Sequence, residues 1–151
     1  MLIQDAAYEN LLKSRRQVLH RRVGEVLRDD FAATAAAEPE LLAHHFTEAG
    51  HSDTAVEYWQ RAGDLAMARS GHTEAIHHFS VALDLLSKLC EKPGCAAKEL
   101  ELCVKLGPAL IMVKGPSSPE VEAIYRRAVA LEVREDSATQ FKALWGFIIA
   151  R

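Results

Sequence analysis

The chain has 151 residues, a length that suits one ordinary domain. Hydrophobic residues make up 49% and charged residues 26%, which is typical of soluble globular proteins, and no apolar run is long enough to cross a membrane. The formal net charge of -3 argues against a general nucleic-acid binder, because such proteins are usually strongly basic. The acidic start lacks the features of a signal peptide, so a cytoplasmic location is expected.

The first 31 residues are expected to form two helices. Residues 4–12 read as a short helix, and Ser14 is a plausible N-cap for a longer helix from Arg15 to about Asp30. The longer helix places five apolar residues on one face, namely Val18, Leu19, Val23, Val26 and Leu27.

An alanine-rich link is expected next, at residues 32–37. Pro39 suits the first turn of a following helix that runs to about Ala49, and Gly50 is expected to end it in the C′ position. The residues of this helix that are expected to face inward are Leu42, His45, Phe46 and Ala49.

One pattern then occurs twice, in residues 54–59 and again in residues 74–79. Each copy has a small residue, a branched apolar residue and a large aromatic at helical spacing, and each follows a turn signal. The two stripes are Ala55, Val56, Trp59, Ala62, Gly63 and Ala66, and then Ala75, Ile76, Phe79, Ala82, Leu83 and Leu86. Such a helix cannot bury its stripe alone and needs a similar helix on each side, which predicts an α-solenoid with Trp59 and Phe79 in the core.

The stretch resembles the tetratricopeptide repeat (TPR). The residues that carry this resemblance, by their packing pattern, are Phe46, Gly50, Ala55, Trp59, Ala62, Gly63, Ala75, Phe79 and Ala82. Two features depart from the family: the copies lie about 20 residues apart rather than about 34, and the proline that ends each repeat is missing. The resemblance implies an all-α protein, a right-handed TPR-like superhelix of antiparallel helix pairs with about 7–8 helices.

The second half is expected to hold three more helices. Residues 90–94 contain Pro-Gly and break the chain before a helix from about Ala96 to Val113, in which Pro108 predicts a kink or short break. Ser118 and Pro119 then suit the N-cap and first turn of another helix. Its stripe contains Val121, Ile124, Tyr125, Ala128 and Leu131.

The last helix starts at Asp136 or Ser137 and is apolar most of the way round. Its stripe contains Ala138, Phe141, Leu144, Trp145 and Ile148. A solenoid normally closes with a polar cap, so this helix is expected to be exposed and adhesive, a possible homodimer surface. We therefore expect the chain to be a piece of a longer helical array.

A wider resemblance covers nearly the whole chain. Five segments, in their order along the chain, resemble the region behind the ATPase module of bacterial STAND-type signal-transduction ATPases, including proteins with a class III adenylate or guanylate cyclase domain. The segments are LIQDAAYENLLKSRRQVLHRRVGEVL, ELLAHHFTEAG, AVEYWQRAGDLA, LGPALIMVKG and FKALWGF. The resemblance implies that residues 1–31 are the helical tail of a winged-helix-like arm and that residues 38–151 are TPR-like repeats. It further implies an ATPase ahead of this chain and more repeats behind it.

No catalytic, cofactor-binding or metal-binding residue is predicted. The phosphate-binding loop G-x-x-x-x-G-K-[ST] is absent, and the cysteines lack C-x-x-C spacing. The histidine pairs His44-His45 and His77-His78 chelate poorly, because adjacent helical residues point in different directions. The basic segment at residues 13–22 could contact nucleic acid or phosphate, but a solvated face or salt bridges to a neighbouring domain is the favoured interpretation.

Two classes of function remain. The first is a non-catalytic interaction scaffold that binds a protein or peptide partner, or neighbouring domains of its parent chain, and regulates an ATPase or cyclase. Its candidate partner-facing residues, from the repeat pattern, are His44, Glu48, Asp64 and Met67. The alternative is a small enzyme or a sensor that holds a small-molecule effector between helices, for which an enclosed pocket with convergent polar groups would be diagnostic.

Overall fold

A computed structural model describes the backbone at residues 2–89, 95–131 and 137–149, and the side chains at 12–89, 95–131 and 138–149. These ranges hold eight helices and no strand, which confirms the all-α class and the expected number of helices. The helices are α1 (Leu2–Asp30), α2 (Ala32–Ala37), α3 (Pro39–Glu48), α4 (Ser52–Ala68), α5 (His72–Leu89), α6 (Cys95–Lys114), α7 (Pro119–Ala130) and α8 (Ser137–Ile149). Within these ranges no helix is both long and apolar enough to span a bilayer.

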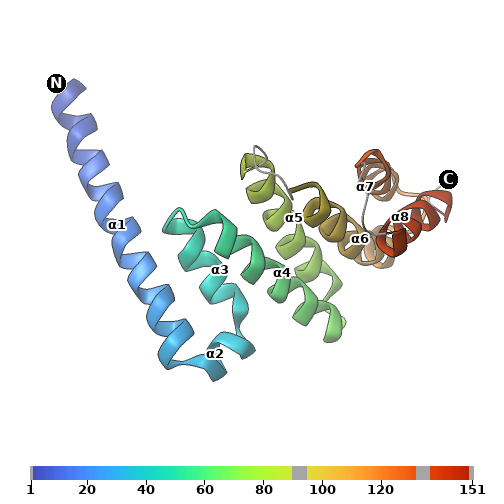
Figure 1. Cartoon of the computed structure of the whole chain (residues 1–151), viewed down its shortest axis with the longest axis horizontal. Helices are drawn as coiled ribbons and strands as arrows, with labels where there is room; N and C mark the ends of the chain where they lie inside the picture. The colour runs from blue at the N-terminus through green and yellow to red at the C-terminus, as the bar shows by residue number, and fades with distance from the viewer. Residues whose placement is uncertain (1, 90–94, 132–136, 150–151) are drawn as a thin grey trace.

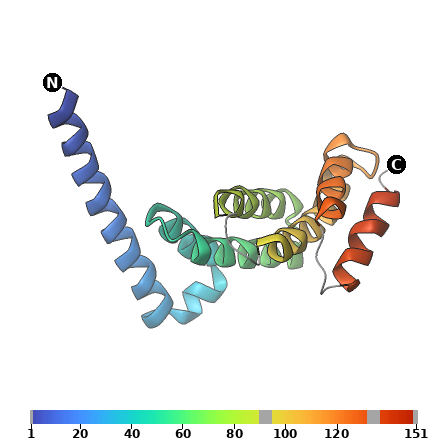
Figure 2. The ribbon, with the colours of Figure 1, turned by 45° about the horizontal axis from the view of Figure 1, so that its top comes forward.

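The helices form a row, with the N-terminus and C-terminus at opposite ends (Figure 1). From α3 onward each helix packs against the next one along the chain, and α6 additionally contacts α4 on one side and α8 on the other. The N-terminal half of α1 extends away from the rest of the molecule in both views (Figures 1 and 2). The core is therefore a series of interfaces between neighbours rather than a single centre.

The expectation of two N-terminal helices was wrong, because α1 is continuous from Leu2 to Asp30. Ser14 lies inside this helix and does not cap a new one. Neither glycine nor proline occurs between residues 12 and 15, and serine in a helix interior costs only a few tenths of a kcal/mol, roughly 0.5 relative to alanine. Nothing in this stretch is strong enough to end a helix.

The apolar face of α1 is largely exposed, whereas amphipathic helices usually bury such a face. Val18 and Leu19 are 64% and 62% exposed, and only Leu27 packs against the core. The contact with α3 is made at Gly24 instead, where an added Cβ atom would lie 3.2 Å from the ring of Phe46. A glycine that admits an aromatic ring thus decides which side of α1 meets its neighbour.

Residues 32–37 form the short helix α2 and not the predicted link. Five of the six residues are alanine, the best helix former, and helix propensity is enough to settle a segment that has no other strong preference. This short helix connects α1 to α3 (Figure 1).

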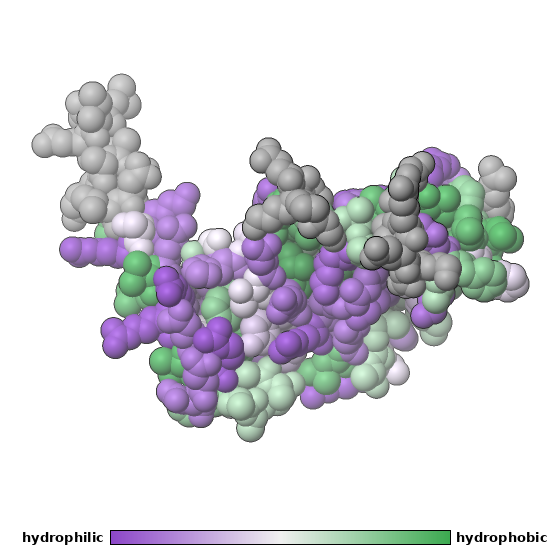
Figure 3. All heavy atoms as spheres, viewed as in Figure 1, coloured by the Kyte–Doolittle hydropathy of each residue, from purple (hydrophilic) through white to green (hydrophobic). Residues whose placement is uncertain are grey.

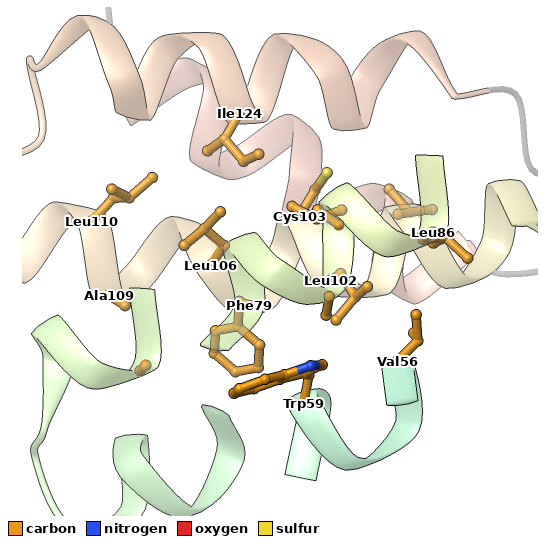
Figure 4. Packing of buried hydrophobic residues seen from close by; sticks show 14 of the residues in the cluster. Val56, Trp59, Phe79, Leu86, Leu102, Cys103, Leu106, Ala109, Leu110 and Ile124 are labelled. Carbon is orange, nitrogen blue, oxygen red and sulfur yellow. The ribbon is translucent and has the colours of Figure 1, made fainter. Parts of the chain in front are cut away.

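The twice-repeated stretch forms the packed centre of the molecule, α4 and α5. Phe79 is fully buried and Trp59 is 9% exposed, so both are core residues as predicted (Figure 4). The indole N–H of Trp59 donates to Thr47 Oγ1 across 3.0 Å, which ties α4 to α3. The other residues of the repeat pattern that are buried are Phe46, Ala55, Ala62, Gly63, Ala75 and Ala82.

Gly50 ends α3 in the left-handed conformation, with φ of +76°, as expected for a C′ glycine. The N–H of His51 donates to the carbonyl of Phe46, and the N–H of Gly50 donates to that of Thr47. These two bonds define a Schellman motif, which satisfies carbonyls at the helix end and turns the chain into α4.

The same motif ends α4, but there the left-handed residue is Ser70 (φ 59°) and not Gly71. Side chains pay about 1–2 kcal/mol for this conformation, and glycine does not. We expect Ser70→Gly to raise the free energy of unfolding by roughly 1 kcal/mol, measured by urea denaturation. Ser87→Gly is the matched control, because Ser87 is also exposed but lies inside α5, where glycine should destabilise by about 0.5 kcal/mol. Equal effects of the two substitutions on stability would contradict the left-handed conformation of Ser70.

Helix α7 begins as predicted, and α6 departs from the prediction at Pro108. Ser118 Oγ accepts from the N–H of Val121 at 3.2 Å, so it caps α7. Of the kink or short break expected at Pro108, the break is absent: α6 runs through this exposed residue without interruption. The predicted breaker at residues 90–94 and the helix start at Asp136 lie outside the described residues.

The apolar stripe of α8 is exposed, as expected for an adhesive last helix. Phe141 is 65%, Trp145 57% and Ile148 66% exposed. The face that contacts the rest of the molecule includes Ala143, which is 1% exposed, and Phe147, which is partly buried against the core. A Cβ atom added at Gly146 would lie 2.2 Å from a ring carbon of Tyr125, so this glycine is where α7 meets α8.

Candidate functional site

An apolar groove of about 520 Å³ runs between α4, α6 and α8. Its floor includes the buried rings of Phe79 and Tyr125, which reach through from α5 and α7. The remaining lining residues are Asp64, Met67, Val104, Lys105, Pro108, Ile111, Phe141, Lys142, Trp145, Gly146 and Ile149. In size it falls within the usual range of ligand sites, about 300–1,000 Å³.

A polar ladder between α4 and α6 fixes the inner side of this groove. Gln60 Nε2 donates to Glu101, and the Lys105 ammonium lies 2.7 Å from Asp64 Oδ2 and 3.3 Å from Glu101 Oε1. Burial alone would raise the pKa of Glu101, but the charge of Lys98 and the hydrogen bonds from Gln60 and Lys105 outweigh it and lower the pKa. Glu101 is therefore anionic at neutral pH and holds the two helices in register.

Of the four residues predicted to face a partner, two line the groove and two do not. Asp64 and Met67 both line the groove. His44 and Glu48 are exposed on α3 and lie outside it. The groove uses α4, α6 and α8, so α3 contributes nothing to its lining.

A second hollow, of about 670 Å³, lies where α1 and α2 face α4. Two guanidinium groups, those of Arg28 and Arg61, contribute to it. Both have partners within the chain: Arg28 donates to the carboxylate of Asp29, and Arg61 lies 5.0 Å from the ring centroid of Tyr58. The hollow is more polar than the groove.

Three histidines, His20, His44 and His45, meet between α1 and α3, which the sequence pattern did not reveal. His20 Nδ1 lies 2.9 Å from His45 Nδ1, and the ring centroids of the three residues are 5.1 to 6.0 Å apart. A neutral imidazole has one donor and one acceptor nitrogen, so one of the two Nδ1 atoms must be unprotonated. The contact requires at least one neutral ring.

The pKa of His45 lies below its ordinary value of 6.5, first because of burial and then because of the charges of His20 and His44. Burial likewise lowers the pKa of His78, which stacks on Trp59. Because unfolding restores the ordinary pKa, the unfolded state binds more protons, and stability rises with pH.

We expect the full contribution of these histidines above about pH 6.5 and its progressive loss as the pH falls below that value. Urea denaturation from about pH 8 to about pH 5 measures the slope. His45→Gln should flatten the slope in part, and the double variant with His78→Gln should flatten it further. His51→Gln, at an exposed position, is the control and should leave the slope unchanged.

The described cysteines are free thiols. Burial raises the pKa of Cys103 to about 11, so this thiol is an unreactive core residue at neutral pH. Cys90 lies outside the described residues. Within the ranges that the structure describes, no three His, Cys, Asp or Glu side chains, the three histidines included, are arranged so that they could hold a metal ion.

A curated relative is similar to the chain over nearly its whole length. Over 149 residues the chain is 33% identical to an uncharacterized protein of Rhizobium meliloti (strain 1021), a match that includes 97% of this chain. The chain spans only 14% of the length of that relative. No protein-family model matches the chain, and no solved structure matches it.

Proposed function

We propose that the chain is a non-catalytic protein-interaction scaffold, built as a TPR-like right-handed superhelix of antiparallel helix pairs. The observation that carries the proposal is the alternation of helices: α6 contacts both α4 and α8, these three helices supply most of the groove lining, and α5 and α7 pack behind them. In a helical solenoid, such a groove along one layer is the usual binding surface.

The composition of the groove supports a protein ligand over a small metabolite. Of its polar side chains, Asp64 and Lys105 already neutralise each other at 2.7 Å. Sites for small molecules generally use several convergent polar groups within an enclosed cavity. An open, apolar groove instead suits the apolar face of a peptide or helix.

We further propose that this scaffold is one part of a longer signalling protein of the STAND ATPase type. The support is the order of the five sequence segments described above, together with the small share of the Rhizobium meliloti protein that the chain spans. Binding in the groove would then regulate the catalytic modules of the parent protein, and the repeats themselves would take no part in the chemistry.

The test is a selection of random peptides, displayed on phage, against the purified chain. The proposal expects enrichment of peptides whose binding is lost when Ile149, on the wall of the groove, is replaced by arginine. The alternative, an effector-binding sensor, is favoured only by the two arginines of the second hollow. A thermal-shift screen with nucleotides and metal ions tests it, and a ligand-dependent rise in Tm without any selected peptide would overturn the scaffold proposal.

A further inference from the structure

We infer that the groove between α4, α6 and α8 binds one amphipathic α-helix of a partner protein, with its apolar stripe inside the groove and a carboxylate beside Lys142. This inference rests on the proposed scaffold function and specifies the class of partner. The groove is lined mainly by apolar side chains from several helices and has a volume of about 520 Å³, which suits several side chains of such a stripe.

The α8 wall supplies the anchors for an apolar stripe. Phe141 and Trp145 stack with ring centroids 6.3 Å apart, and both line the groove while remaining 65% and 57% exposed. Hydrophobic residues gather over this end of the molecule (Figure 3). Exposed aromatic pairs beside a groove are typical anchors of protein interfaces, where tryptophan is enriched among the residues that dominate affinity.

The charges at the rim select an acidic partner. Lys105 pairs with Asp64, and Lys98 lies 3.5 Å from Glu101 in the adjoining hollow. Lys142 borders both the groove and that hollow, and no ion-pair partner occurs for it within the described ranges. A carboxylate next to the apolar stripe would pair with Lys142, whereas a basic helix would be repelled.

A second copy of this chain, docked through its own α8, fits the groove less well. Between residues 138 and 149 the only charged residue of α8 is Lys142. Pairing two α8 helices would therefore bring two ammonium groups together without a carboxylate. Complementarity favours a different polypeptide, and the oligomeric state of the free chain becomes an outcome of the test.

The experiment uses two synthetic peptides of about four helical turns each. Both carry leucine at i, i+3, i+4 and i+7 positions on an alanine background; one has glutamate at the flanking positions and the other lysine. Binding is followed by tryptophan fluorescence, because Trp145 is exposed in the groove whereas Trp59 is only 9% exposed. We expect a blue shift with the acidic peptide and an affinity at least about tenfold higher than that of the basic peptide, equivalent to roughly 1.4 kcal/mol.

Two matched variants locate the binding site. Ile149 and Leu144 are 47% and 48% exposed on the same helix, but Ile149 lines the groove and Leu144 lines a small hollow on the α7 side. Ile149→Arg should abolish binding, and Leu144→Arg should retain it. Lys142→Glu should reverse the preference, so that the basic peptide binds more tightly; this exposed substitution keeps the test valid if Ile149→Arg fails to fold.

Several results would overturn the inference. Equal affinity for the two peptides would exclude the proposed preference for an acidic partner. Loss of binding in Leu144→Arg alone would exclude the proposed site. A molar mass in light scattering that halves on Ile149→Arg would assign the groove to a second copy of the chain. If phage selection yields groove-dependent peptides that are basic or extended, only the partner class is wrong; if it yields none and the acidic peptide fails to bind, the scaffold function fails as well.

Discussion

Replacing Phe79 by alanine is expected to lower the free energy of unfolding by about 3–5 kcal/mol. The ring is fully buried between α4 and α5 and lies beside Trp59 (Figure 4). Its loss removes a large apolar surface and leaves a cavity that the surrounding helices cannot fill without moving. Ordinary domains are stable by about 5–15 kcal/mol, so this one change would remove a large part of the total.

Phe141→Ala is the matched control for this prediction. Phe141 is also a helical phenylalanine, but it is 65% exposed, and exposed substitutions usually change stability by less than about 0.5 kcal/mol. Both variants are measured by urea denaturation with circular dichroism. Similar losses in the two variants would mean that Phe79 is not the centre of the α4–α5 interface.

Gly63 gives an independent check of the same contact. A Cβ atom there would lie 2.4 Å from a ring carbon of Phe79. Gly63→Ala gains about 1 kcal/mol of helix propensity, but overpacking costs about 1–3 kcal/mol, so a net loss is expected. In the Phe79→Ala background the clash is absent, and Gly63→Ala should then be neutral or stabilising, a non-additivity that a double-mutant cycle measures.

The centre of the fold could be predicted from the sequence because its signals are strong and local. Small residues and a large aromatic at helical spacing occur twice, and they identify both helices and their buried faces. Turn chemistry at Gly50 and Ser118 located helix ends to within a residue. Helix propensity and capping act over one or two turns, so a single sequence is enough to detect them.

The two end helices were harder, because periodicity identifies an apolar face without saying what covers it. In α1 and α8 the apolar stripes are exposed, and the contacts form at Gly24 and Gly146 instead. Each glycine admits an aromatic ring from the next helix of the row, Phe46 in one case and Tyr125 in the other. The glycines are visible in the sequence, but their aromatic partners become apparent only in the folded structure.

The groove could not be predicted for a related reason. Its inner wall depends on a register in which Asp64 meets Lys105 and Gln60 meets Glu101, pairs that are both 41 residues apart. That register is set by how α5 packs between its neighbours, and no local pattern encodes it. The repeat pattern predicted Asp64 and Met67 to face a partner, and both line the groove, whereas the α8 side of the groove was predicted only as an adhesive helix.

Tyr125 is expected to control the attachment of the last helix. Its ring lies between two glycines: a Cβ at Gly107 of α6 would come within 2.2 Å of its hydroxyl oxygen, and one at Gly146 of α8 within 2.2 Å of a ring carbon. Each glycine-to-alanine substitution should cost about 1–3 kcal/mol of packing, less the gain of about 1 kcal/mol in helix propensity. The two substitutions should destabilise different parts of the chain.

Gly107→Ala should lower the Tm of the whole chain, because α6 contacts α4, α5, α7 and α8. Gly146→Ala should instead release α8 with little change in the main transition, since α8 packs mainly against α6 and α7. Hydrogen exchange resolved by segment distinguishes the two cases, with faster exchange confined to α8 in the second. Release of α8 should also abolish peptide binding in the groove, because α8 forms one of its walls.

Tyr125→Phe separates the two contacts chemically. It removes the hydroxyl, the nearest atom to an added Cβ at Gly107, but leaves Cζ, which lies 2.3 Å from an added Cβ at either glycine, and the other ring carbons that an added Cβ at Gly146 would meet. The phenylalanine background should therefore restore part of the stability lost in Gly107→Ala and none of the α8 protection lost in Gly146→Ala. Equal rescue of both variants would show that Tyr125 moves as a whole and that α8 is held by the rest of its interface with α6 and α7.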